Sequence, residues 1–98
     1  MKGYWISVYT KIENKEKLKE YAAKATLAIK KYSGEFLVRG GKHTSLEGLD
    51  YPRTVIVVFP NYDIAEKCYN STEYKEALRI LKGNAERNLQ IIEGFNTE

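Results

Sequence analysis

The sequence predicts one α+β domain over residues 1–98, with its elements in the order β-α-β-β-α-β. Two observations lead to this prediction. Short segments rich in aromatic and β-branched residues are typical of strands, and they alternate with longer segments whose apolar residues recur at helical spacing. The chain has 98 residues, which is room for one domain and one modest core.

The first strand is predicted at residues 4–10, where two rows of side chains alternate. One row is Tyr4, Ile6 and Val8, and the other is Trp5, Ser7 and Tyr9. A long amphipathic helix should follow, with Asn14 as its N-cap and an apolar stripe that runs from Leu18 to Tyr32. Gly34 should end this helix, because glycine tolerates the backbone angles found after a helix C-terminus.

The second strand is predicted at Glu35–Arg39, where Gly40 and Gly41 end it, and the stretch through Asp50 should form a hairpin arm and a turn. Residues 54–59 are the most strand-like segment of the chain. They are apolar on both faces, which is typical of a central strand covered on both sides.

The second half of the chain repeats the helix-strand plan. Residues 63–69 carry a short helical pattern, and Asn70-Ser71 should supply the cap of a second helix, whose apolar stripe runs from Tyr74 to Ala85. A last strand is predicted at residues 89–95. This order favours a ferredoxin-like βαββαβ sandwich, in which a four-stranded antiparallel sheet carries its helices on one face and strands one and three lie in the middle.

The opposite face of such a sheet would lack a cover. We assign Trp5 and Tyr9 to this helix-free face, together with side chains of the apolar third strand. An apolar patch that covers one whole face of a sheet is rarely left exposed on a monomer. We therefore expect a homodimer in which two sheets pack face to face as a dimeric α/β barrel.

Composition and charge narrow the possible partners. The net charge of +3 comes from lysines spread among glutamates, a pattern that does not favour nucleic acid. The longest apolar run, residues 55–59, is too short to span a membrane. Cys68 is the only cysteine and no signal peptide is recognisable at the N-terminus, so we expect a cytoplasmic protein.

The sequence also resembles a known family over nearly its whole length. The matching segments are residues 3–6, residues 34–41, residues 46–48, Pro52 with Arg53, residues 57–60, Ala65, residues 69–74, and Glu93 with Gly94. They resemble the bacterial domains of unknown function numbered 1330, of the dimeric α/β-barrel superfamily. The chain departs from the family pattern at Cys68, where Trp is favoured, and at Asn61, where Ser is usual. The resemblance implies the fold and the dimer, but no catalytic residue.

Two segments contain candidate chemistry. Arg39 before Gly40 and Gly41 could bind a carboxylate or phosphate, or it could pair with Glu47 across the hairpin or with the partner subunit. His43 is the only histidine, so acid-base catalysis near neutral pH that requires an imidazole would have to use it. Ser45 and Asp50 nearby suggest a triad only superficially, because no nucleophile elbow accompanies them. One histidine and one cysteine do not make a metal site, so we expect no metal and no cofactor.

These residues support three functional hypotheses. The first is a pocket for a small amphipathic or anionic molecule, an environment to which the eight tyrosines are suited. The candidate ligand-binding residues are Trp5, Tyr9, Arg39, His43, Glu47 and Arg53. The second hypothesis is a cofactor-free enzyme, since the superfamily that the chain resembles includes monooxygenases and isomerases. The third is a structural or regulatory interaction module without a small ligand.

Overall fold

The structure, a computed structural model, describes residues 1–96. Four strands and three helices make up this part of the chain. Their order is β1 (Gly3–Ile12), α1 (Lys15–Lys31), β2 (Glu35–Arg39), β3 (Arg53–Phe59), α2 (Tyr62–Tyr69), α3 (Thr72–Leu81) and β4 (Ala85–Glu93).

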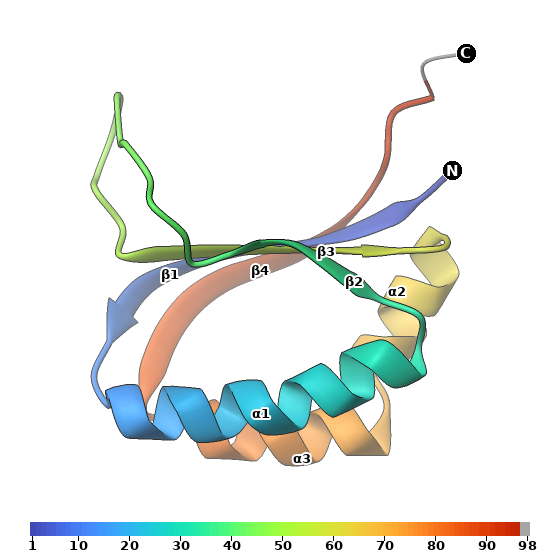
Figure 1. The fold of residues 1–98 in the computed structure, drawn as a ribbon, viewed down its shortest axis with the longest axis horizontal. Helices are drawn as coiled ribbons and strands as arrows, with labels where there is room; N and C mark the ends of the chain where they lie inside the picture. The colour runs from blue at the N-terminus through green and yellow to red at the C-terminus, as the bar shows by residue number, and fades with distance from the viewer. Residues whose placement is uncertain (97–98) are drawn as a thin grey trace.

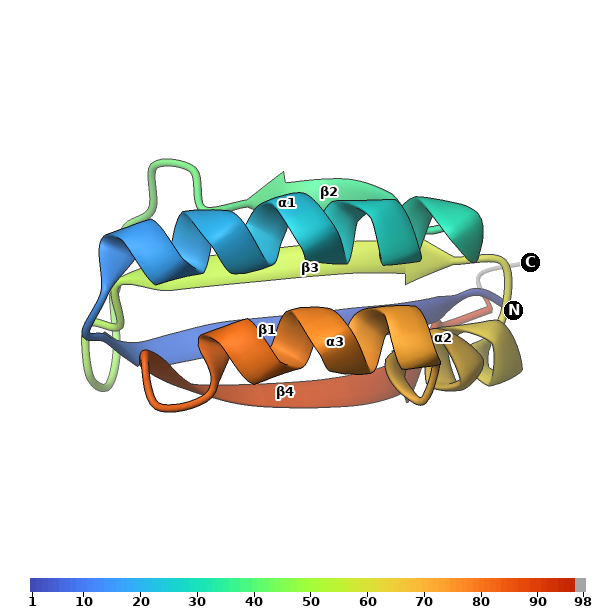
Figure 2. The ribbon, with the colours of Figure 1, turned by 90° about the horizontal axis from the view of Figure 1, so that it is seen from below.

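The strands form one sheet in the order β2-β3-β1-β4, and every neighbouring pair is antiparallel. All three helices lie on one side of this sheet (Figure 1). Seen from that side, α1 and α3 lie next to each other across the sheet (Figure 2). The predicted ferredoxin-like α+β sandwich, with β1 and β3 in the middle, is confirmed.

Local sequence explains where the helices begin. Asn14, Asn61 and Ser71 precede α1, α2 and α3, and the side chain of each accepts a hydrogen bond from the backbone N–H three residues later. Such caps satisfy donors that a helix start would otherwise leave free. The predicted cap Asn14 is therefore confirmed, and Ser71 is the capping residue of the predicted pair Asn70-Ser71.

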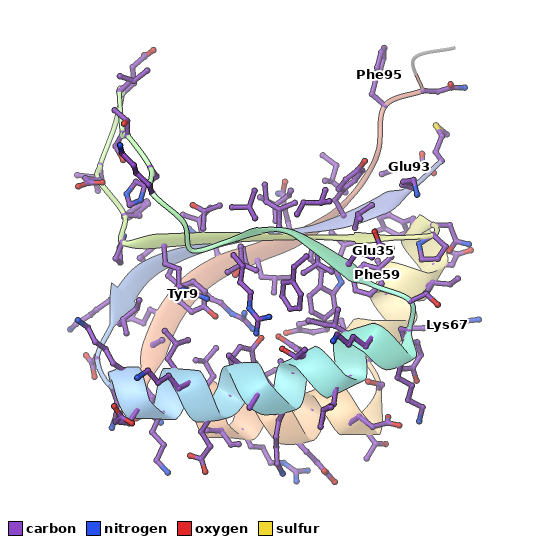
Figure 3. The ribbon with its side chains drawn as sticks, viewed as in Figure 1. Tyr9, Glu35, Phe59, Lys67, Glu93 and Phe95 are labelled. Atoms are coloured by element: carbon purple, nitrogen blue, oxygen red, sulfur yellow. The ribbon has the colours of Figure 1, made fainter. Side chains whose placement is uncertain are left out.

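The assignment of Trp5 and Tyr9 to the helix-free face was wrong. Both side chains point toward the helices and are 2% exposed, while Ile6 and Val8 occupy the opposite face and are half-buried. Tyr9 and Phe59 can be followed into the space between the sheet and the helices in Figure 3. Alternation separates the two rows of a strand but does not say which row faces the helices. The row with Trp5 and Tyr9 faces the helices because its larger side chains are buried there and their polar tips find hydrogen-bond partners. The Trp5 Nε1–H, for example, donates to the Ala65 carbonyl at 2.9 Å.

The predicted helix end and last strand also need correction. The last helix, α3, stops at Leu81 and β4 begins at Ala85, which we had placed in the helix. Gly83, with a φ of +80°, makes the turn between them. Residues 40–52 form a loop without a strand, where we expected a hairpin arm. Finally, β2 contains an irregularity between Phe36 and Val38, and Phe36 and Arg39 both line the same side of the sheet, where the Arg39 guanidinium lies over the Phe36 ring.

The sheet face away from the helices carries no secondary-structure element of the described chain. Its half-buried side chains include Ile6, Val8 and Ile56, and Ile6 is paired with Ile56 across the two central strands. The loop of residues 40–52 and the C-terminal segment both rise from the sheet on this side (Figure 1). We call this surface, with Ile6, Val8 and Ile56 at its centre, the open face. None of the helices in residues 1–96 has the length and apolar character needed to cross a membrane.

Trp5 provides a test of the assigned faces. Its ring contacts those of Phe59 and Tyr74, with centroid distances of 5.1 Å and 4.9 Å. Trp5→Phe should lower the free energy of unfolding by about 2–3 kcal/mol, because a buried hydrogen bond is lost and a small cavity is left. Urea denaturation measures this change. The neighbouring Tyr4→Phe, on the opposite face, should cost less than about 0.5 kcal/mol; equal losses would contradict the assignment.

Candidate functional site

A small chamber lies between α1 and the helix-facing side of the sheet. The remaining cavity has a volume of about 30 Å³, room for about two water molecules. Aromatic, aliphatic and guanidinium groups line it. The lining residues are Trp5, Ser7, Tyr9, Leu18, Tyr21, Ala22, Ala25, Ile29, Phe36, Arg39, Arg53, Val55, Val57, Arg87 and Leu89.

Arg87, on β4, is surrounded by tyrosine hydroxyls at one end of the chamber. Its Nη2 donates to the Tyr74 hydroxyl at 2.6 Å, and its Nη1 donates to the Tyr21 and Tyr9 hydroxyls at 3.1 Å and 3.3 Å. The Tyr21 and Tyr74 hydroxyls are 2.6 Å apart. Arg87 is thus held by neutral acceptors, and no carboxylate among residues 1–96 forms an ion pair with it.

These tyrosines stay protonated at neutral pH. Burial raises the pKa of Tyr9, Tyr21 and Tyr74 above the ordinary value, and it outweighs the opposing effect of the Arg87 charge. Protonated phenols can donate hydrogen bonds but cannot cancel the charge of a guanidinium. The Arg87 cluster, defined as Arg87 with Tyr9, Tyr21 and Tyr74, therefore leaves a net positive charge beside the chamber.

Two more guanidiniums line the chamber. Arg39, at the end of β2, is exposed; it donates from Nη2 to the Thr26 hydroxyl at 2.8 Å and stacks on the Phe36 ring. Arg53, at the start of β3, is half-buried and lies near the Tyr9 ring. None of the described lining residues is Asp, Glu or His. The chamber therefore combines three positive charges with no negative one.

The structure divides the six candidate ligand-binding residues into two groups. Trp5, Tyr9, Arg39 and Arg53 line the chamber, whereas His43 and Glu47 are exposed on the loop outside it. Arg39 does not pair with Glu47, which makes no ion pair with residues 1–96.

The superficial triad of the loop lacks the geometry for nucleophilic catalysis. His43 and Ser45 both bind the same oxygen of Asp50, at 3.2 Å and 2.7 Å. The serine thus contacts the acid and not the base that would have to activate it. Both hydrogen bonds lower the pKa of the Asp50 carboxyl, and the bond from Ser45 has the larger effect. No three His, Cys, Asp or Glu side chains gather within residues 1–96 as a possible metal site.

Sequence reasoning missed Arg87 and Tyr21 as site residues. Arg87 stands two residues before Leu89 and four before Ile91, so it lies in the row of β4 that packs on the core. A charged residue in an otherwise apolar row of a strand could have indicated a site residue. It was not recognised, because the preceding helix was predicted to extend through Ala85 and the strand to begin after Arg87. Tyr21 belongs to the apolar stripe of α1. Its hydroxyl contacts Tyr74 and Arg87, and the sequence alone does not indicate these partners.

The buried tyrosines predict a loss of stability at alkaline pH. Unfolded tyrosines ionise near about pH 10, whereas Tyr9, Tyr21 and Tyr74 keep their protons in the fold. Above that pH the unfolded state binds fewer protons, so the free energy of unfolding falls as pH rises, by up to about 1.4 kcal/mol per pH unit for each such tyrosine. Urea denaturation between about pH 9 and 11.5 measures the slope.

Tyr21→Phe should make this slope shallower than in the wild type, while Tyr62→Phe controls for the loss of a tyrosine at an exposed site. Identical slopes for wild type and Tyr21→Phe would contradict the placement of Tyr21 in a buried cluster.

Several solved structures share this fold. A protein of unknown function from Rhodopseudomonas palustris has a TM-score of 0.80 and 11% identity, over 97% of this chain and 83% of that one. SnoaB from Streptomyces nogalater, a cofactor-independent oxygenase, has a TM-score of 0.63 and 10% identity over 98% and 95%. A dimeric protein of unknown function with a ferredoxin-like fold from Bacteroides fragilis has a TM-score of 0.57 and 18% identity over 95% and 96%.

At these identities the neighbours show the fold alone. The search of curated proteins gave no match. A family match, in contrast, covers residues 2–95, nearly the whole chain, and it agrees with the resemblance seen in the sequence. The chain therefore belongs to the family described as domain of unknown function DUF1330.

Proposed function

We propose that this protein is a homodimer that binds a small, anionic, amphipathic molecule in the chamber of each protomer. One observation carries the ligand class: three guanidiniums line the chamber and none of the described lining residues is acidic. Buried or half-buried positive charge is costly unless an anion accompanies it. An anionic ligand would supply the missing charge.

The remaining walls favour an amphipathic ligand. Leu18, Ala22, Phe36 and Val55 line the chamber beside the guanidiniums. An apolar or aromatic body could pack there while its charged end meets the arginines, the usual design of small-molecule pockets. The present cavity is small, so a ligand larger than about two waters must displace side chains. Arg39 is exposed and can move at little cost.

The dimer is supported by the open face. Ile6, Val8 and Ile56 lie on it, and no element of the described chain covers them. A structural neighbour from Bacteroides fragilis is described as dimeric. A second copy would bury both open faces at once, with the sheets packed face to face. We place the dimer in the cytoplasm because the single cysteine needs no oxidising compartment.

A second candidate is a cofactor-free enzyme, since SnoaB is described as a cofactor-independent oxygenase. The protonated tyrosines of the Arg87 cluster could donate hydrogen bonds to a developing oxyanion. A general base that works near neutral pH is missing from the described lining residues, because the only histidine lies on the outer loop. Binding is therefore the better supported function, and turnover of a bound ligand would favour the enzyme.

Charge reversal at the chamber tests the binding of anions. Wild-type protein, Arg39→Glu and Lys24→Glu would be titrated calorimetrically with a panel of aromatic carboxylates, phosphates and neutral analogues. Arg39→Glu should weaken anion binding roughly fivefold, because an attractive charge becomes a repulsive one at a solvent-exposed site. Lys24→Glu makes the same change on the exposed surface of α1 and should have less than about a twofold effect. Failure of every anion to bind the wild type would contradict the proposal.

A matched pair of substitutions tests the dimer. Ile56→Asp places a charge at the centre of the open face and should convert the dimer into monomers in sedimentation velocity runs at micromolar concentration. Leu27→Asp makes a similar change on α1, where Leu27 is already 71% exposed, and should leave the dimer intact. Circular dichroism checks that both variants fold. A monomeric wild type, or equal behaviour of the two variants, would contradict a dimer through this face.

A further inference from the structure

Arg53 is held in place by packing alone. It is paired in register with Tyr9, and its guanidinium carbon lies 5.9 Å from the centre of the Tyr9 ring. On the other side it crosses the backbone of Gly40. A Cβ built at Gly40 would lie 2.1 Å from Nη1 and 2.7 Å from Cζ of Arg53, and the φ of Gly40 is +66°. Only glycine therefore fits at this position without displacing the guanidinium.

The hydrogen-bond donors of Arg53 are free. Its Nε is buried and has no partner, and the side chain makes no hydrogen bond or ion pair with residues 1–96. Arg39 and Arg87, in contrast, already donate to hydroxyl groups. A buried donor without an acceptor costs roughly 1–3 kcal/mol, and more when it is charged. Such a group at a chamber wall marks the point where an acceptor is expected.

Building on the proposed function, we propose that Arg53 is the residue that binds the ligand and that it binds a carboxylate. Nη1 lies against Gly40, so the ligand would bind the edge formed by Nε and Nη2, and it must displace the side chains that now bury Nε. This edge matches the two coplanar oxygens of a carboxylate in a bidentate pair. The apolar body of the ligand then packs on Phe36 and Val55, which line the same chamber.

The surroundings favour a carboxylate over a phosphate group. A phosphate presents three free oxygens in a tetrahedral arrangement and carries more charge near neutral pH. Sites for it commonly use the backbone N–H groups of a helix start or a glycine-rich loop. The first three residues of α1 are not among the described lining residues, nor are Gly40 and Gly41. Nη1 and Nη2 of Arg87 already donate to tyrosine hydroxyls. One free, planar guanidinium edge suits two oxygens.

Three probes that share a phenyl ring test the carboxylate: benzoate, its neutral analogue benzamide, and phenylphosphonate. Calorimetric titration of the wild-type protein should show benzoate binding at least about tenfold more tightly than benzamide and more tightly than phenylphosphonate. Arg53→Met and Arg53→Lys should each weaken benzoate binding about tenfold or more, the second because an ammonium cannot form the bidentate pair. Arg39→Met should weaken it less than about threefold, since Arg39 is exposed.

The two adjacent glycines provide a matched control. Gly40→Ala should displace the Arg53 guanidinium and weaken benzoate binding, whereas a Cβ at Gly41 meets no atom within 4 Å, so Gly41→Ala should bind like the wild type. Circular dichroism shows whether each variant folds. If Arg53→Met does not fold, Arg53→Lys still tests the inference.

The outcomes separate the two proposals. If no anion in either panel binds the wild type, both fail. If anions bind but Arg53→Met or Gly40→Ala binds benzoate like the wild type, or if phenylphosphonate binds more tightly, the assignment of Arg53 and the carboxylate is overturned while anion binding stands.

Discussion

Burial of the aromatic row of β1 under the helices is the constraint on which the rest of this structure depends. Trp5 and Tyr9 each have an apolar body and a polar tip, and such side chains are stable inside a protein only when the tip finds a partner. The Trp5 indole N–H donates to the Ala65 carbonyl of α2, and the Tyr9 hydroxyl accepts from Arg87 of β4. These two contacts connect the central strand to a helix on one side and to the edge strand on the other.

The partner of Tyr9 has a consequence for function. A buried arginine is usually neutralised by a carboxylate. Here the three phenols of the Arg87 cluster satisfy its hydrogen bonds without cancelling its charge. The fold therefore keeps a positive potential at the end of the chamber, and Arg39 and Arg53 add to it. Under the proposed function, the same tyrosines that complete the core would define the kind of ligand that the chamber favours.

The sequence predicted what depends on local pattern, and it failed where distant residues decide. The order of elements, the cap Asn14, the capping pair Asn70-Ser71 and the central position of β3 followed from periodicity and capping chemistry. The side of the sheet occupied by Trp5 did not, because both rows of β1 are apolar enough to be buried. Four of the six candidate site residues line the chamber: Arg39 and Arg53 from strand ends, and Trp5 and Tyr9 from the face opposite to the predicted one. Arg87 was missed because the last strand was predicted from residue 89, whereas β4 already begins at Ala85.

In the proposed ligand-binding dimer, the alternation of the strands would give the two faces of the sheet separate functions. In β3, Val55 and Val57 line the chamber, and Ile56 between them lies on the open face. A substitution on one face can therefore change ligand binding with little effect on the contact between protomers, and the reverse holds for the other face. The exception is the loop of residues 40–52. It rises on the side of the open face, yet its first residue, Gly40, supports Arg53 in the chamber. Contact of a second copy with this loop would thus act directly on the position of the guanidinium.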